Sequence, residues 1–283
     1  MEKLMLGVIG DPIAHTLSPL IQNTIAEKLG IPCSYTAHHV KLDTLPDFVE
    51  MARKEFRGFN ITIPHKRNIL PYLAELDPYA AACGAVNTVR IEDGKLYGYN
   101  TDGDGLRAAM AVNGIRMEDQ DIVLLGAGGA ALSIFRKALQ VGAKHITVLC
   151  RLPEEAVAFS EPGVTVDFFD VETVSDTLKK YIDKADVLIN ATPLGMEGID
   201  SHFTDFSFLD NTKAAVVDIV YKPSTTALVA EARKRGLTAM NGLGMLIYQA
   251  VYAFSIFSGE TFDFDEMAAH VTKVVSAAIY KEN

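Results

Sequence analysis

The sequence predicts an α/β protein built from two domains, and three observations support that prediction. The chain has 283 residues, whereas one compact domain usually takes about 100–200. Short apolar runs alternate with helix-like patterns along most of its length, as in α/β sheets. A glycine-rich loop at 126–130 follows one apolar run and opens a helical segment, which is typical of a doubly wound parallel sheet.

Composition excludes several classes of protein. Hydrophobic residues make up 49% of the chain, which is ample for buried cores and too high for a disordered protein. The formal net charge is −10, so extended binding to nucleic acid or to an anionic membrane, both of which need a basic surface, is not expected. A small anionic substrate is compatible with this charge, because its pocket needs only one or two local donors. We therefore expect a small-molecule partner.

The cysteines and histidines indicate no metal site. The chain has three cysteines, Cys33, Cys83 and Cys150. Their odd number, without a CxxC or Cys/His cluster, indicates reduced thiols in a cytoplasmic protein and no structural zinc. Four histidines of the first half lack a third partner at metal-ligand spacing, namely His15, His38, His39 and His65.

No targeting or membrane segment is expected. Residues 1–10 contain no long apolar stretch followed by a small-residue cleavage site, so they do not look like a signal peptide. The most apolar long segment, 243–257, contains Gln249 and is shorter than the roughly 18 residues that a membrane helix needs. We interpret this segment as a buried helix.

The first domain is expected to alternate strands and helices. Strands are predicted over 4–9, 34–40 and 58–63, and helices over 18–29 and 45–54. The first helix has Ser18 as its N-cap and Pro19 at its first position, where these residue types are preferred. Segments 86–92 and 95–99 form a hairpin, because the Asp-Gly pair between them is a strong turn signal.

The second domain continues the alternation. A connecting helix is predicted over 105–112, strands over 122–125, 146–149, 187–190 and 215–219, and helices over 130–141 and 228–234. This order predicts a parallel, doubly wound sheet. The chain after Gly242 is helical, and such closing helices often pack back onto the first domain. The first domain is therefore placed at 1–103, completed by 240–283, and the second at 104–239.

The glycine loop, Gly-Ala-Gly-Gly-Ala-Ala over 126–131, fits the pattern G-x-G-x-x-A. Gly126 permits a tight turn, Gly128 lets the backbone approach a pyrophosphate, and the small Ala131 allows close helix–strand packing. The N-terminus of the next helix supplies aligned N–H donors. Because strand, loop, helix and next strand occur in order, the loop predicts a Rossmann-type dinucleotide site.

The end of the next strand bears on which dinucleotide binds. NAD sites usually place an acidic residue about 20 residues after the loop, to hold the ribose 2′-hydroxyl. This chain has Cys150 and Arg151 there instead, and an arginine suits a 2′-phosphate. NADP is therefore favoured. Glu154 and Glu155 follow closely and would repel a phosphate that they faced, so NAD stays an alternative.

Two hydroxyls mark a candidate carboxylate site. Residues 10–19 read Gly-Asp-Pro-Ile-Ala-His-Thr-Leu-Ser-Pro, which places Thr16 and Ser18 two residues apart at a helix entrance. Hydroxyls with nearby N–H groups can clamp a carboxylate. The alternative is that Ser18 only caps the helix.

Several ordered motifs resemble those of the shikimate dehydrogenase family, and the resemblance runs essentially end to end. The carboxylate motif resembles 10–19, the lysine motif 60–66, the asparagine motif 84–88, the aspartate motif 100–103, the glycine loop 126–130, and three later motifs 190–196, 218–223 and 242–249. The first hydroxyl of the family's carboxylate motif is commonly serine, whereas this chain has Thr16, which bears on the choice between shikimate and quinate. The family's NADP-type loop often reads Asn-Arg-Thr with a later arginine, and this chain has Glu155 at the later position.

The resemblance implies a catalytic pair. Lys66 would be the acid/base and Asp102 its partner. The chemistry agrees, because reducing a ketone needs a hydride donor and a proton donor at the carbonyl oxygen. A carboxylate beside a lysine fixes its position, and the two groups can share a proton.

The resemblance also implies the binding residues. The substrate carboxylate would be held by Thr16 and Ser18, and the ring hydroxyls by Thr62, Asn87 and Gln249. Tyr221 would lie near the substrate. The dinucleotide would be contacted by Gly126, Ala127, Gly128, Gly129, Ala130, Cys150, Arg151, Thr192, Leu194, Met196, Ile219, Gly242 and Met245. Of these, Ile219 and Gly242 would line the nicotinamide side.

The expected activity is the reversible NADPH-dependent reduction of 3-dehydroshikimate to shikimate in aromatic amino-acid biosynthesis, by a monomer or homodimer. A first alternative is a catabolic quinate/shikimate dehydrogenase that uses NAD. A second is a non-catalytic homologue that senses the metabolite, although Lys66 and Asp102 are both present. A third is a folate-type dehydrogenase, in which Thr16 and Ser18 would have no purpose.

Overall fold

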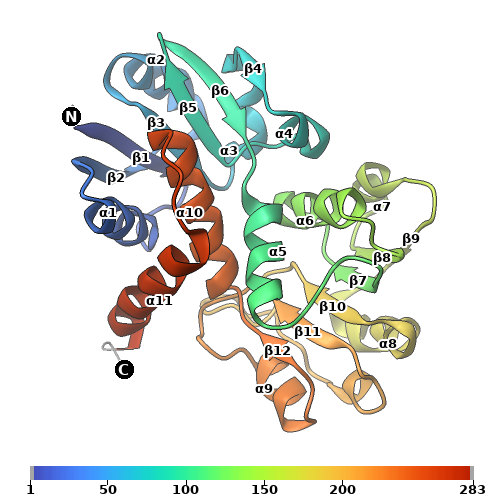
Figure 1. Cartoon of the computed structure of the whole chain (residues 1–283). Helices are drawn as coiled ribbons and strands as arrows, with labels where there is room; N and C mark the ends of the chain where they lie inside the picture. The colour runs from blue at the N-terminus through green and yellow to red at the C-terminus, as the bar shows by residue number, and fades with distance from the viewer. Residues whose placement is uncertain (1–2, 281–283) are drawn as a thin grey trace. The chain divides into compact units, whose positions relative to one another are not determined.

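A computed structural model describes residues 3–280 and divides the chain into two compact units (Figure 1). Unit 1 contains the described residues of Met1–Gly105 and Ile247–Asn283, and unit 2 is Leu106–Leu246. The first unit is therefore discontinuous in sequence, with the second inserted into it.

Unit 1 is built on a mixed six-stranded sheet. Its strands are β1 (Leu4–Gly10), β2 (Cys33–His39), β3 (Gly58–Ile61), β4 (Glu75–Leu76), β5 (Thr88–Glu92) and β6 (Lys95–Tyr99). They lie in the order β2-β1-β3-β5-β6-β4. Strand β1 runs parallel to β2 and β3, whereas β5 is antiparallel to β3 and β6. The predicted hairpin is thus β5–β6, and Asp93 and Gly94 take the positive φ angles, 51° and 71°, that its tight turn requires.

The helices of unit 1 come from both ends of the chain. They are α1 (Ser18–Leu29), α2 (Leu45–Glu55), α3 (His65–Asn68), α4 (Pro78–Cys83), most of α10 (Leu243–Ser258) and α11 (Phe264–Tyr280), together with the start of α5 (Asp102–Val112). Helix α11 packs against α1, and α10 lies beside the N-terminal strands in Figure 1. The predicted return of these helices to the first domain is confirmed.

Close packing of α10 on the sheet depends on a glycine. A Cβ added to Gly58 on β3 would lie 2.5 Å from the Phe257 ring of α10 and 2.6 Å from the Val89 carbonyl. Beneath this contact, buried apolar side chains of four strands form a core with those of α2, among them Ile9, Phe59, Ile61, Val89, Leu96 and Phe48. Burial of these side chains provides the main stabilisation of the unit.

Helix α1 has the predicted bounds, but its N-cap differs from the prediction by one residue. The N-cap is Leu17, and Ser18 already lies in the helix, with Pro19 next to it. The Thr16 hydroxyl accepts the Ser18 N–H at 3.2 Å, which satisfies one of the free N–H donors of the first turn. The expectation of Ser18 as N-cap is therefore wrong, and its hydroxyl is not used to cap the helix.

Unit 2 is built on an entirely parallel six-stranded sheet, as predicted. Its strands are β7 (Asp121–Leu125), β8 (His145–Cys150), β9 (Val164–Phe168), β10 (Val187–Asn190), β11 (Ala215–Asp218) and β12 (Ala239–Met240), and its helices are α6 (Gly129–Gln140), α7 (Pro153–Ala156), α8 (Val174–Lys179) and α9 (Ala227–Lys234), with most of α5. The strand order is β12-β11-β10-β7-β8-β9. Buried side chains on both faces of β7 and β10 explain their continuous apolar sequence.

The strand order of unit 2 reverses at β7. The chain proceeds from β7 outward to β8 and β9, and then returns to β10 on the other side of β7. In such sheets ligands bind outside the carboxyl ends of the strands at the point of reversal. That point lies between the loops that follow β7 and β10, and these carry the glycine loop and the motif at 190–196.

Some elements of unit 2 are not among those predicted, namely β9, α7, α8 and β12. Strand β9 lies at an edge of the sheet with its side chains only partly buried, and α8 spans just six residues. Within residues 3–280, no helix is long and apolar enough to cross a membrane.

Candidate active site

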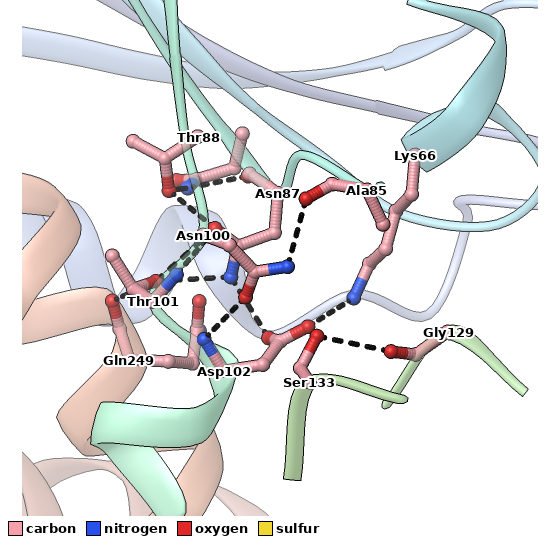
Figure 2. A network of polar contacts seen from close by, with 11 residues as sticks. Lys66, Ala85, Asn87, Thr88, Asn100, Thr101, Asp102, Gly129, Ser133 and Gln249 are labelled. Carbon is pink, nitrogen blue, oxygen red and sulfur yellow. Dashed lines mark hydrogen bonds and ion pairs between the residues drawn. The ribbon is translucent and has the colours of Figure 1, made fainter. Parts of the chain in front are cut away.

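Lys66 and Asp102 form an ion pair in unit 1. Lys66 lies in α3 and Asp102 begins α5, and Lys66 Nζ lies 2.6 Å from Asp102 Oδ2 (Figure 2). The Lys66 side chain is 18% exposed and that of Asp102 8%. This burial restricts solvent around the pair, so its charges interact more strongly than a surface pair would. The remaining exposure leaves the pair accessible to a small molecule.

Asn87 and Asn100 fix the carboxylate. Asn87 Nδ2 donates to Asp102 Oδ1 at 2.8 Å, so each Asp102 oxygen has its own donor. Asn100 Oδ1 accepts the Asp102 N–H at 3.1 Å, and Asn100 Nδ2 donates to the Ala85 carbonyl at 2.9 Å. These bonds hold the start of α5 against the turn before β5, and they orient the carboxylate toward Lys66.

The turn that carries Lys66 is held on both sides. The fully buried His65 bonds through Nε2 to the Val40 carbonyl at 2.6 Å, so this nitrogen carries a proton. The Val86 N–H donates to the Lys66 carbonyl at 2.8 Å. His65 is therefore a buried residue that fixes the turn carrying Lys66.

Thr101 links the same site to α10. Its backbone N–H donates to Asn87 Oδ1 at 2.9 Å, and its hydroxyl donates to the Gln249 carbonyl at 3.0 Å (Figure 2). A Cβ added to Gly105 would lie 2.7 Å from the Gln249 N, so only glycine allows α5 and this part of α10 to approach so closely. Gln249 is thereby held beside the segment that carries Asp102.

The paired hydroxyls lie together at the start of α1. The Thr16 hydroxyl donates to Ser18 Oγ at 3.1 Å, and both residues are partly buried. Thr62 follows β3, where its N–H donates to the Ile9 carbonyl and its carbonyl accepts from the His65 N–H. All the predicted unit 1 residues therefore lie in turns and helix starts beside β1, β3 and β5, except Gln249 on α10.

The glycine loop of unit 2 has the conformation that a dinucleotide site requires. Gly126 has a φ of 112°, and a Cβ there would lie 2.9 Å from the Ala191 carbonyl oxygen, so both the turn and the packing demand glycine. A Cβ on Gly128 would meet no atom within 4 Å, and its φ of −73° suits any residue. The open space at Gly128 fits a phosphate group, and Gly129 starts α6 immediately beyond it.

A buried polar network supports the loop after β10. Asn190 Oδ1 accepts from the Thr192 N–H and hydroxyl at 3.1 and 2.6 Å, and Asn190 Nδ2 donates to Asp218 Oδ1 at 3.0 Å. Asp218 also accepts from the Val220 N–H at 3.1 Å and the Thr226 hydroxyl at 2.6 Å. Burial raises the pKa of Asp218 to about 6, against the three donors, which lower it.

Sequence reasoning did not assign a role to Asn190 or Asp218 themselves. Both are completely buried, and each is the last residue of an apolar parallel strand, β10 or β11. A polar residue at the carboxyl end of an otherwise apolar strand was the available signal. Their network fixes the two loops that carry the predicted residues Thr192 and Ile219.

The remaining predicted cofactor residues lie at the end of β8, in the loops after β8, β10, β11 and β12, and in the first turn of α10. A Cβ on Gly242 would lie 1.8 Å from the Ile219 carbonyl oxygen, so these two residues touch through their backbones. Leu194 and Met245 are buried and Met196 is 39% exposed. Tyr221, predicted to lie near the substrate, also belongs to unit 2 and is partly buried, which raises its pKa.

The loop after β8 has Glu155 folded back onto it. Glu155 Oε2 accepts the backbone N–H groups of Arg151 and Leu152 at 3.1 and 3.2 Å, while the Arg151 side chain is exposed. Cys150 is completely buried, and this burial raises the pKa of its thiol to about 11. Cys150 is therefore a packed thiol, whereas the Arg151 side chain is open to solvent.

Three domain families match the sequence. The shikimate dehydrogenase substrate binding domain matches residues 8–89, and the shikimate 5'-dehydrogenase C-terminal domain matches 242–272. The saccharopine dehydrogenase NADP binding domain matches 122–240, the span that contains the glycine loop.

Curated relatives match along nearly the whole chain. The shikimate dehydrogenase (NADP(+)) of Alkaliphilus oremlandii is 38% identical over 269 residues, which cover 91% of this chain and 92% of that protein. The shikimate dehydrogenase (NADP(+)) of Methanococcus maripaludis is 37% identical, with 90% and 92% covered.

Solved structures share the fold. Shikimate 5-dehydrogenase from Listeria monocytogenes, in complex with shikimate and NAD, matches with a TM-score of 0.83 and 34% identity over 94% of this chain and 95% of that one. The enzyme from Thermus thermophilus, in complex with NADP(H) and shikimate, matches with a TM-score of 0.83 and 33% identity over 96% and 99%.

Proposed function

The chain belongs to the shikimate dehydrogenase family, and from this premise we propose that it catalyses the reversible NADP-dependent reduction of 3-dehydroshikimate to shikimate. The reaction is a step of aromatic amino-acid biosynthesis. The observation that carries the proposal is the partly buried Lys66–Asp102 ion pair at 2.6 Å, with both carboxylate oxygens held by their own donors.

The pair supplies the proton chemistry. The bound dinucleotide supplies or accepts the hydride. In the reducing direction the Lys66 ammonium donates a proton to the ketone oxygen as the hydride arrives at carbon, and Asp102 keeps the amine in place. In the oxidising direction the Lys66–Asp102 pair takes the hydroxyl proton. Asn87 holds Asp102 in one orientation throughout, which lowers the reorganisation needed during the transfer.

The other polar residues of unit 1 are assigned to substrate binding. Thr16 and Ser18 offer two adjacent hydroxyls to the carboxylate, consistent with a Ser18 side chain that does not cap α1. Thr62, Asn87 and Gln249 are assigned to the ring hydroxyls. Tyr221 of unit 2 is assigned to the substrate as well. We assign the substrate domain to 1–103 with 240–283 and the dinucleotide domain to 104–239.

NADP is the proposed dinucleotide. The matched relatives are named for NADP(+), and the residues of the glycine loop fit a dinucleotide phosphate. The binding surface is assigned to the loops after the strands of unit 2, through Gly126, Ala127, Gly128, Gly129, Ala130, Cys150, Arg151, Thr192, Leu194, Met196, Ile219, Gly242 and Met245. Within this set Arg151 is assigned to the 2′-phosphate, since its side chain is exposed. No metal takes part in the proposed reaction.

The experiment that tests the function is a spectrophotometric assay of nicotinamide reduction with shikimate or quinate, each with NADP or NAD. Activity highest with shikimate and NADP would support the proposal. Equal or higher rates with quinate and NAD would contradict it and favour the catabolic alternative. A folded protein that binds shikimate without turnover would contradict it in favour of a metabolite sensor.

The cellular setting is also a proposal. We propose a cytoplasmic protein that acts as a monomer or homodimer, and the three cysteines, all free thiols, support a reducing compartment. Size-exclusion chromatography with light scattering measures the oligomeric state, and cell fractionation measures the location.

A further inference from the structure

Hydrogen bonds lead from Tyr35 to Asp102 in a single direction. The Tyr35 hydroxyl donates to Asn60 Oδ1 at 2.7 Å, and Asn60 Nδ2 donates to Thr88 Oγ1 at 3.0 Å. The Thr88 hydroxyl donates to Asn87 Oδ1 at 2.8 Å, and Asn87 Nδ2 donates to Asp102 Oδ1 at 2.8 Å. Figure 2 shows the last part of this chain, from Thr88 to Asp102 and Lys66. Every donor in it points toward the carboxylate.

Backbone groups fix this direction. Asn60 Nδ2 also donates to the Asn87 carbonyl at 3.1 Å, and a carbonyl can only accept. The Thr101 N–H, which can only donate, bonds to Asn87 Oδ1 at 2.9 Å. Both side-chain amides therefore have one permitted orientation. Asn60 must then turn its oxygen away from Thr88, and that oxygen needs a donor.

Burial makes the loss of a donor to the Asn60 oxygen costly in free energy. Tyr35 is 2% exposed, Asn60 7%, Thr88 0%, Asn87 3% and Asp102 5%. Bulk water does not compete with these bonds, and an unpaired polar atom among them would carry a large desolvation cost. Burial also raises the pKa of the Tyr35 hydroxyl well above its usual value, so Tyr35 stays a donor over the working pH range.

Tyr35 connects the chain to the start of the molecule's first helix. Asn23 on α1 bonds to Tyr35 on β2 twice, through Asn23 Nδ2 to the Tyr35 carbonyl and the Tyr35 N–H to Asn23 Oδ1, both at 3.0 Å. The Ser18 hydroxyl interacts with the Tyr35 hydroxyl and partly offsets the effect of burial. Tyr35 thus lies between the proposed carboxylate-binding hydroxyls and the acid–base pair.

We propose that Tyr35 is a positioning residue for the reaction: its hydroxyl satisfies the buried Asn60 oxygen and, through Asn60, Thr88 and Asn87, holds the Asp102 carboxylate in register with Lys66. The proposal rests on the proposed function for the role of Asp102. Tyr35 touches no reacting atom in it and acts only through the amide chain.

Removing the hydroxyl has a defined structural consequence. In Tyr35→Phe the ring is kept, and Asn60 Oδ1 retains only the longer bond from Gln22 Nε2 at 3.4 Å. The Asn60 amide cannot compensate by rotating, because its oxygen would then face the Asn87 carbonyl, so its buried oxygen lacks a strong donor and its bonds to Thr88 and to the Asn87 carbonyl are held less firmly. Asn87 loses part of the support that aims its amide at Asp102, so the acid–base pair is held in its reactive geometry for a smaller share of the time.

The test is a double-mutant cycle in shikimate oxidation with NADP. Tyr35→Phe and Thr88→Val each break the chain, and each is expected to lower kcat about tenfold with KM for shikimate changed less than about threefold. The double variant is expected to have the kcat of the less active single variant, because a hydrogen-bond chain that is already broken loses little from a second break. Thr88→Ser keeps the hydroxyl and is expected to restore kcat to within about threefold of the wild-type value.

Tyr248→Phe is the matched control. Tyr248 is equally a buried tyrosine of unit 1, and its hydroxyl donates to Asp265 Oδ1 at 2.8 Å, outside the chain. It is expected to lose thermal stability like Tyr35→Phe while keeping its kcat. Equal losses of kcat in both variants, or multiplicative losses in the cycle, would overturn the proposal.

A second measurement does not depend on turnover. The side-chain amide protons of Asn87, observed by NMR, are expected to shift and to exchange faster with water in Tyr35→Phe and Thr88→Val but not in Tyr248→Phe. Unchanged Asn87 signals in the first two variants would overturn the proposal even if kcat fell. Inactive wild-type protein with the expected Asn87 changes would contradict the proposed function and leave the positioning effect established.

Discussion

At the scale of single residues, removal of the Lys66 amine tests the proton transfer directly. Lys66→Ala is expected to lower kcat by about 10²–10⁴-fold, the usual size of a general acid/base contribution, while the dinucleotide still binds. Steady-state kinetics with shikimate and NADP measures the loss. Lys54→Ala, which removes an exposed lysine of α2, is the control and should keep full activity. Unchanged turnover in Lys66→Ala would remove this residue from the mechanism.

Asp218 makes stability depend on pH. Its folded pKa, about 6, lies above the usual value of 3.8, so the group favours the folded state at low pH and loses this contribution as pH rises through 6. The gap in unfolding free energy between the wild type and Asp218→Asn is expected to change by about 2 kcal/mol between pH 4 and pH 7. The wild type loses this stability relative to the variant as the pH rises. Urea denaturation at both pH values measures it, and a gap that stays constant or moves the other way would refute the shift.

The asparagine variant suits this test because its shape is retained. The amide oxygen of Asp218→Asn can accept from Asn190 and the Val220 N–H, and the Thr226 hydroxyl can rotate to accept from the new NH₂ group. Only the ability to titrate is lost. A change in the slope of stability against pH can therefore be assigned to the carboxyl group.

Glu155 is expected to oppose the 2′-phosphate of NADP. Its carboxylate lies on the backbone of Arg151 and Leu152, where a negative ligand at Arg151 would meet it. Glu155→Gln keeps an acceptor and removes the charge, and it should raise the ratio of kcat/KM for NADP over NAD about tenfold, or about 1.4 kcal/mol. Glu154→Gln is the control one residue away. A ratio that changes equally in both variants would show a general charge effect only.

Whether the sequence predicted a residue of the site depends on whether that residue stands in a recognisable motif. Lys66, Asn87 and Asp102 each stand in a distinct local motif, and the structure joins Lys66 to Asp102 and Asp102 to Asn87 by hydrogen bonds. Tyr35 stands outside every such motif, and Asn60 opens the lysine motif without a role assigned to it, because a polar residue inside a strand looks like part of its solvent-facing alternation. Only the tertiary fold shows that both are buried against each other.

At the scale of the elements, two glycines of one loop should behave in opposite ways. Gly126→Ala is expected to destabilise the protein by about 1–3 kcal/mol, because its φ of 112° and the Ala191 carbonyl both exclude a Cβ. Gly128→Ala is expected to keep the melting temperature and to weaken NADP binding, since only a bound ligand would meet the new methyl group. Thermal denaturation with and without NADP separates the two effects, and equal destabilisation would contradict them.

The elements were predicted best where burial is continuous. Strand β7 is buried on both faces and reads as an uninterrupted apolar run, which the sequence identifies by itself. Strand β9 is an edge strand of partly exposed side chains, and the six residues of α8 are too few to establish a helical period. The bounds of α1 were predicted correctly, but its N-cap was assigned to Ser18, whereas the N-cap is Leu17 and the Thr16 hydroxyl accepts the Ser18 N–H.

At the scale of the whole molecule, the two units differ in how they depend on the rest of the chain. Unit 2 is one continuous segment, Leu106–Leu246, with its own parallel sheet and core. A protein limited to 106–246 is expected to fold by itself and to unfold cooperatively. Circular dichroism during heating measures this, and a broad transition without cooperativity would contradict it.

Residues 1–105 alone are expected to stay unfolded or only partly folded. Without α10 and α11 the sheet loses the Phe257 ring over Gly58, and the Gln22 amide loses its bond to the Ala250 carbonyl at 3.1 Å. The apolar face that α10 covers would then be exposed to water. Heteronuclear NMR of the fragment tests this, and well-dispersed signals typical of a packed core would contradict it.

The discontinuity of unit 1 also sets an order of events during biosynthesis. A ribosome delivers the segments that carry Lys66 and Asp102 early, then the complete inserted unit, and only at the end the helices that finish the first sheet. The N-terminal part of unit 1 must therefore wait, with apolar surface uncovered, while some 140 residues are translated, which takes on the order of ten seconds at about 5–20 residues per second. Gln249 reaches Thr101 only when translation is nearly complete, so a chain that stalls before α10 carries its acid–base residues without a finished site.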